Sequence, residues 1–155
     1  MINFYKKGIT VVELLVVLAV LGIIIAVALP QFAKIRENQV LKSTVEEVTS
    51  SLNKAQSQTL SSVGSSSYGV HFQSDKVIIF KGIVFSAVDL SNETIDIIIP
   101  ASITDVTLGG VSGSTGDVYF NRLSGAPNQT GTITVSTTSY SKIITISATG
   151  IVSVN

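Results

Sequence analysis

The chain opens with a long apolar block in which charged residues are almost absent. From Leu14 to Leu29 no residue is charged. With the apolar residues before Glu13 the block reaches about 20 residues, which is roughly one bilayer span as a helix. A lone carboxylate, Glu13, stands near the start of the block, and Lys6 and Lys7 precede it. A carboxylate in hydrocarbon costs several kcal/mol unless it is paired, so Glu13 is a candidate functional residue.

The helical pattern continues beyond the apolar block. Pro30 has no backbone N–H and is predicted to kink or loosen the helix rather than to end it. After it, apolar residues recur at the spacing of one helical face, at Leu41, Val45, Val48, Leu52 and Ala55. We therefore expect one helix from Ile9 to about Gln58, whose second half packs on its own domain. A free-standing coiled coil would need more heptads and larger core residues.

In the rest of the chain, apolar and polar residues alternate with a period of two. Residues 61–67 are rich in serine and predict a flexible linker. The segments that predict short strands are 68–72, 76–80, 83–88, 94–99, 106–108, 117–121, 131–137, 142–148 and 151–154. The predicted fold class is α+β, with a long N-terminal helix packed on a C-terminal head of antiparallel strands in a sandwich or pair of sheets. The glycine-rich residues 109–116 lack the lysine of a phosphate loop and predict a flexible loop.

Composition excludes several functional classes. The 155 residues allow one modest domain besides the helix, and the formal net charge is zero. Because the chain has no cysteine, it has neither a disulfide framework nor thiol chemistry. The residues from 68 onward have four basic side chains against six acidic ones, and the four are Lys76, Lys81, Arg122 and Lys142. Such a balance does not favour binding to nucleic acid.

The head offers little chemistry. His71 is the only histidine and lies in an alternating segment, so we expect an ordinary strand position and no metal site. The serines have no base near them that could activate a nucleophile. The acidic residues are scattered and do not have the spacing of calcium ligands. We therefore predict no catalytic residue, no cofactor and no enzymatic activity.

The apolar block by itself leaves three interpretations open. An ordinary signal peptide or signal anchor fits the charge and hydropathy. A cleaved signal peptide is disfavoured because Ala26-Val27-Ala28, the nearest approach to a cleavage site, leads into a continued helical pattern. The third interpretation is a resemblance: residues Lys6-Lys7-Gly8-Ile9 followed by Glu13 resemble the N-terminus of a type IV prepilin or pseudopilin.

The resemblance implies a set of processing and assembly residues. The family has a short basic leader that ends in glycine, so cleavage is expected between Gly8 and Ile9 and methylation on the new amine of Ile9. Glu13 is then the fifth residue of the processed chain and the expected assembly residue. Gly22 and Pro30 fall where pilin helices commonly carry a glycine and a proline, and are expected to serve helix packing and kinking. The family more often has phenylalanine at the position of Ile9.

The same resemblance divides the chain and names its partners. The expected parts are the leader 1–8, the transmembrane and filament-core helix 9–29, its amphipathic continuation 30–60, the linker 61–67 and the head 68–155. The expected partners are a prepilin peptidase and methyltransferase, other pilin or pseudopilin subunits and an inner-membrane assembly platform. Lys6 and Lys7 place the N-terminus in the cytoplasm by the positive-inside rule, which leaves the head outside the cytoplasmic membrane.

The head narrows the resemblance further. Residues 68–72, 118–125, 131–135 and 143–154 resemble the GspH/FimT-like branch of minor pseudopilins and minor pilins. That branch implies a position at or near the tip of a short filament, in a type II secretion or type IV pilus machine. Two alternatives stay open at this point: a DNA-binding minor pilin for natural transformation, and a singly anchored surface protein with an ordinary signal anchor.

Overall fold

The structure is a computed structural model and describes residues 8–155. Most of the predicted leader 1–8, with the two lysines that set the predicted orientation, lies outside the described residues. The chain divides into two compact units, one that ends at Arg36 and one that spans Glu37–Asn155.

One helix, α1, spans Val11–Leu60 and confirms the long helix predicted from the apolar periodicity. Pro30 lies inside α1, so the proline does not end the helix. Its residues before Glu37 are exposed, apart from the half-buried Ala28. The five residues of the predicted second stripe are all buried, at 6% exposure or less: Leu41, Val45, Val48, Leu52 and Ala55. The amphipathic half of the helix therefore packs on its own domain, as its pattern predicts.

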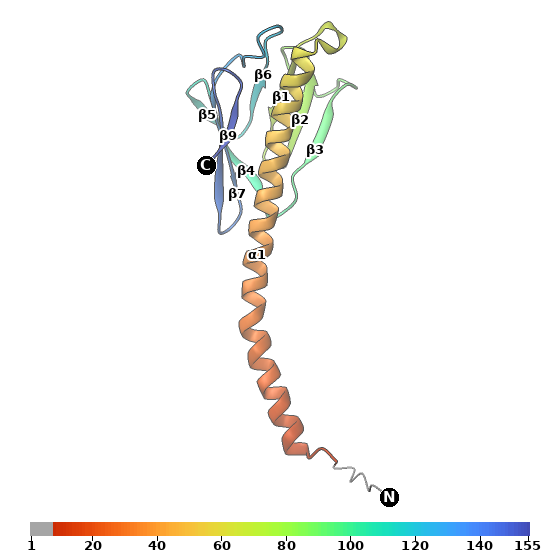
Figure 1. Ribbon diagram of the computed structural model, residues 1–155, viewed down its shortest axis with the longest axis vertical. Coiled ribbons are helices and arrows are strands. Elements are labelled where there is room, and N and C mark those ends of the chain that lie inside the picture. The colour runs from red at the N-terminus through yellow and green to blue at the C-terminus, as the bar shows by residue number, and fades with distance from the viewer. Residues whose placement is uncertain (1–7) are drawn as a thin grey trace, which may run out of the picture. The chain divides into compact units, whose positions relative to one another are not determined.

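The unit that follows contains nine strands and one turn of 3-10 helix among the described residues (Figure 1). The 3-10 helix η1 (Val63–Ser65) lies within the serine-rich stretch. The strands are β1 (Tyr68–Phe72), β2 (Lys76–Lys81), β3 (Glu93–Asp96), β4 (Ser102–Leu108), β5 (Val111–Gly113), β6 (Gly116–Tyr119), β7 (Gly131–Ser136), β8 (Ser141–Ile146) and β9 (Val152–Val154).

These strands form two sheets whose neighbouring strands are all antiparallel. The first sheet has the order β3-β2-β1-β6 and the second has the order β5-β4-β7-β8-β9. The buried face of α1 and side chains of both sheets form one hydrophobic core. Its largest fully buried side chains include Phe72 on β1, Phe120 after β6 and Ile133 on β7. The predicted α+β fold, with a pair of antiparallel sheets, is confirmed.

The predicted strand 83–88 is wrong, because this segment is an irregular loop between β2 and β3. Its alternating apolar residues have no neighbouring strand to pair with. Gly82, the first residue after β2, has a φ of +111°. Further on, the backbone N–H of Asp89 donates a hydrogen bond to the carbonyl of Ser86 in a turn. Val84 is 75% exposed and Val88 is 88% exposed. The alternating apolar residues of this segment therefore lie in a loop and not in a strand.

Two other strand predictions need correction. The predicted strand 94–99 ends at Asp96, because the chain turns before Pro100 and the N–H of Ala101 donates to the carbonyl of Ile98. The glycine-rich segment 109–116 is not a flexible loop. Gly109 and Gly110 both have positive φ, at +59° and +84°, which is the backbone of a two-residue hairpin turn. That turn brings β5 back onto β4.

Candidate assembly site at the start of the helix

Thr10 caps the N-terminus of α1. Its side-chain Oγ1 accepts a hydrogen bond from the backbone N–H of Glu13 at 3.2 Å, and its carbonyl accepts one from the N–H of Leu14 at 3.1 Å. The first four N–H groups of a helix have no partner within the helix, so this side chain satisfies one of them. The sequence Thr10-Val11-Val12-Glu13 has the spacing of a capping box, so this cap could be predicted from the sequence, although it is not among the predictions above.

The cap fixes the place of the lone carboxylate. Glu13 lies in the first turn of α1, where the positive end of the helix dipole favours a negative charge. Its side chain is exposed, and among residues 8–155 it makes no ion pair. The helix therefore presents an anionic group beside apolar surface, open to a cationic partner from another molecule.

The predicted cleavage site is accessible. Gly8 and Ile9 precede α1 and belong to no helix or strand, and the Ile9 side chain is 77% exposed. A peptide bond outside regular structure can enter the extended active-site groove of a peptidase without first being unwound. The structure thus places Gly8, Ile9 and Glu13 within one short stretch at the start of the helix.

The helix beyond Glu13 is apolar and uncovered. An 18-residue window of α1 has mean hydropathy 3.1 and no buried residue, which by length and composition suits a membrane crossing. A signal sequence near an N-terminus passes the same test. Gly22 lies in this part, and a Cβ added to it would meet no other atom within 4 Å. A neighbouring helix could approach the backbone closely at this position.

A comparison with protein families identifies this stretch. Residues 3–29 match the prokaryotic N-terminal methylation motif. The match supports the pilin and pseudopilin family and indicates a type IV pilin-like subunit, a class of structural proteins. The motif includes Gly8, Ile9, Glu13 and Gly22, and Pro30 follows directly after it. No curated protein and no solved structure matches the chain.

The pilin-like motif also bears on location and partners. Together with the apolar helix it is consistent with anchoring in a membrane. It suggests assembly with other pilin subunits and processing by a peptidase. The matched residues end before the amphipathic half of α1, so the match carries no information on the head.

In the head, His71 lies in a small polar cluster that the sequence did not reveal. His71 on β1 pairs with Asp117 on β6, directly opposite it in the sheet register, and the two side chains are in contact through Nδ1 and Oδ1. The Nε2 of His71 lies 2.9 Å from the amide nitrogen of Gln73. The imidazole stacks on Phe85, with ring centroids 3.9 Å apart and an angle of 6° between the planes. His71 lies in strand β1 as predicted, and its side chain also joins this cluster.

This cluster holds the loop between β2 and β3 against the outer face of the first sheet. Phe85 contacts the imidazole on one side and meets the ring of Phe80 edge-on, with centroids 5.7 Å apart. We call these three stacked and edge-on rings, His71, Phe85 and Phe80, the aromatic clasp. Within residues 8–155 no group of three or more histidine, cysteine, aspartate or glutamate side chains could hold a metal ion.

One carboxylate of the same loop has a perturbed pKa. The backbone N–H and the side-chain hydroxyl of Ser91 both donate to Asp89 Oδ1 at 2.8 Å. These two hydrogen bonds stabilise the charged carboxylate and hold the pKa of Asp89 below its ordinary value. Nearby, the side-chain amide of Asn92 donates to the carbonyl of Ser86 at 2.7 Å. The loop is thus internally bonded around a charged turn.

Proposed function

We propose that this chain is a minor pilin or pseudopilin that enters a type II secretion or type IV pilus filament after its leader is removed. Cleavage occurs between Gly8 and Ile9, and the new α-amine of Ile9 is methylated. The observation that carries the proposal is the exposed, capped Glu13 at the start of an uncovered apolar helix, within residues that match the N-terminal methylation motif.

The chemistry of assembly follows from two charges. After cleavage, Ile9 carries a cationic amine, and Glu13 carries a carboxylate beside apolar surface. Each charge alone is costly in hydrocarbon. When the amine of one subunit meets Glu13 of its neighbour, the two charges neutralise each other and the burial cost is offset. That pairing also sets the stagger between neighbouring helices, while residues 14–29 form the packed core of the filament.

The head supports a place near the tip, in the GspH/FimT-like branch. Its strand and glycine positions resemble that branch, and the fold has the expected long helix on antiparallel sheets. In this proposal the chain crosses the cytoplasmic membrane once, with its N-terminus in the cytoplasm and its head outside. Its partners are the peptidase and methyltransferase, the other subunits and the assembly platform.

The N-terminus of the mature chain tests the proposal. The full chain is expressed with a prepilin peptidase and purified from membranes, and its intact mass and terminal sequence are measured. We expect a chain that starts at methylated Ile9, and we expect Gly8→Val to leave the leader attached because a branched side chain replaces the glycine at the cleaved bond.

Other N-termini contradict the proposal. A mature chain that starts after Ala28 identifies an ordinary cleaved signal peptide. A chain that keeps Met1 while a known prepilin in the same cells is processed identifies a signal anchor. Removal of the leader from Gly8→Val at the normal rate also contradicts a prepilin leader.

A further inference from the structure

A groove runs between α1 and the edge of the first sheet. Its larger part has a volume of about 350 Å³, and its lining includes Glu47 and Lys54 from the helix with Ile79 on β2 and Ile95 on β3. A second hollow of about 220 Å³ shares Ser43 and Glu47 with the first and adds Val40 and Ile98 to the lining. The two hollows therefore continue along one side of the helix.

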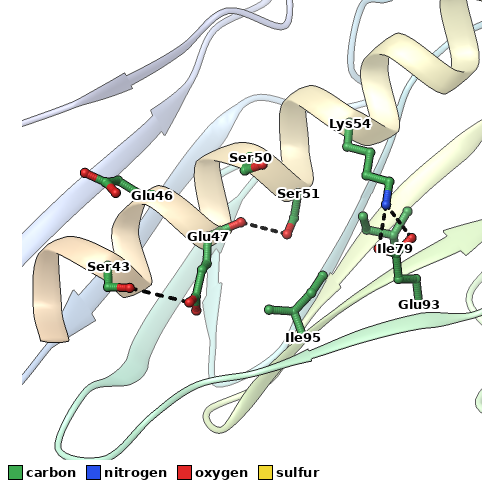
Figure 2. Close-up of a pocket in the computed structure, with 9 residues that line it drawn as sticks. All are labelled: Ser43, Glu46, Glu47, Ser50, Ser51, Lys54, Ile79, Glu93 and Ile95. Carbon is green, nitrogen blue, oxygen red and sulfur yellow. Dashed lines mark hydrogen bonds and ion pairs between the residues drawn. The ribbon is translucent and has the colours of Figure 1, made fainter.

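The groove has an apolar floor and an unpaired acid. Lys54 is already engaged, since its Nζ lies 2.5 and 2.7 Å from the two carboxylate oxygens of Glu93. Figure 2 shows the side chain of Glu47 pointing from the helix toward the strands, beside Ile95, while the side chain of Glu46, which also lines the groove, points away from the strands. Glu47 receives only a hydrogen bond of 3.5 Å from Ser43 Oγ, and within residues 8–155 it makes no ion pair. The groove therefore suits an apolar segment that carries a positive charge.

The chain itself contains such a segment. Phe32 is 67% exposed and Ile35 is 54% exposed on α1, just beyond the uncharged apolar block. Arg36 is exposed and makes no ion pair within residues 8–155. At 100° per residue, Phe32, Ile35 and Arg36 share one face of the helix. Lys34 lies on the opposite face and offers a matched comparison.

Arg36 and Glu47 of the same chain cannot form an ion pair with each other. Arg36 and Glu47 are about three turns apart on the same helix, and only side chains one turn apart are neighbours on a helix surface. Any ion pair between them must therefore join two molecules. An amphipathic helix laid into an apolar groove is a common mode of recognition, with anchors three and four positions apart.

We propose that this groove binds the segment around Phe32, Ile35 and Arg36 of a second copy of the chain. Phe32 and Ile35 cover the floor formed by Ile79, Ile95 and Ile98, and Arg36 pairs with Glu47. The contact is heterologous, since groove and segment are different surfaces, so it can repeat from copy to copy into an open chain. The inference rests on the proposed function in that a filament subunit needs such a contact.

The test is a charge exchange in the full-length chain in a neutral detergent. Self-association is measured by sedimentation of fluorescently labelled protein. Arg36→Glu and Glu47→Lys should each raise the dissociation constant by about tenfold or more, because like charges then face each other. The double variant R36E/E47K should restore the affinity to within about threefold.

The matched controls are Lys34→Glu, on the opposite face of the helix, and Asp75→Lys, at an exposed residue that lines neither hollow. Each should change the dissociation constant by less than about threefold. Thermal unfolding of every variant, followed by circular dichroism, verifies that the head is intact.

Each other outcome overturns the proposal and identifies its alternative. If Arg36→Glu and Lys34→Glu weaken association equally, the basic residues act through net charge and not through an ion pair with Glu47. If Glu47→Lys weakens association but the double variant does not restore it, the groove binds a different segment of the second copy. If no variant changes association, the groove is not an interface. None of these measurements needs the leader to be cleaved, so a failure here is distinct from failure of the proposed processing.

Discussion

The side chain of Thr10 and the backbone of Glu13 are joined by a hydrogen bond of 3.2 Å at the first turn of α1. This bond ties the proposed assembly residue to the start of the helix, one turn from the proposed cleavage site. A carboxylate on a fraying terminus would sample many positions. A capped first turn holds it at a defined height, which an intermolecular ion pair with a fixed stagger requires.

Loss of the cap should loosen that first turn. Thr10→Ala removes the acceptor for the Glu13 N–H and should destabilise the start of the helix by about 1 kcal/mol. In detergent micelles the amide of Glu13 should then exchange with solvent about fivefold faster. Thr10→Ser keeps the hydroxyl and should exchange like the native chain. Equal exchange in all three proteins would show that the cap does not hold this turn.

Gly69 on β1 has no room for a side chain. A Cβ at this position would lie 2.4 Å from Phe80 Cζ and 2.7 Å from the carbonyl oxygen of Val118. Gly69→Ala should therefore lower the free energy of unfolding of the head by about 1–3 kcal/mol or more. Thermal unfolding of the full chain in detergent measures the loss, with the exposed Ser141→Ala as the control. An unchanged midpoint would contradict the described packing of Phe80.

Phe85 should hold the loop between β2 and β3 in place. Phe85→Ala removes the ring that stacks on His71 and meets Phe80, so residues 83–91 should become more open to limited proteolysis by about tenfold. Val84→Ala is the matched control because Val84 is 75% exposed. Equal cleavage of the two variants would mean that the aromatic clasp does not anchor the loop.

The turn at Asp89 should weaken in acid. Hydrogen bonds from Ser91 lower the pKa of Asp89 in the folded chain below its unfolded value of 3.8. A carboxylate of this kind stabilises the fold above the unfolded pKa, and its contribution disappears as the pH falls through the folded pKa. Ser91→Ala removes the hydroxyl donor and should raise the pKa of Asp89 toward its ordinary value. A titration of the Asp89 carboxyl carbon by NMR measures this, and an unchanged midpoint would contradict the assigned cause.

The periodic parts of the chain could be predicted from the sequence. The stripe from Leu41 to Ala55 is buried as expected, because a helix repeats its packed face at fixed spacing whatever it packs against. The motif that contains Gly8, Ile9 and Glu13 could also be found from the sequence, because these residues are close along the chain and need no tertiary contact to be related; their roles in cleavage and assembly stay a prediction. The helix cap at Thr10 could also be predicted from the sequence, since the capping-box spacing lies within four residues.

Features that depend on contacts between distant segments could not be predicted. The pairing of His71 with Asp117 requires the register of β1 against β6, which neither strand encodes alone. The groove needs the side of α1 that carries Glu47 to lie beside β3. The segment 83–88 has the alternating pattern of a strand. It can form a strand only if the edge of a sheet is free to pair with it, and that depends on how the other strands are arranged.

Competition between subunits tests the central claim most directly. Native chain and Glu13→Ala are expressed together in cells that have the assembly machinery, and the two are counted by mass spectrometry in the membrane and in sheared filaments. The account predicts equal membrane insertion and equal removal of the leader, but an excess of native chain in filaments of about tenfold or more, since the variant leaves a neighbour's amine without its partner. Equal amounts of the two proteins in the filaments would contradict the role of Glu13.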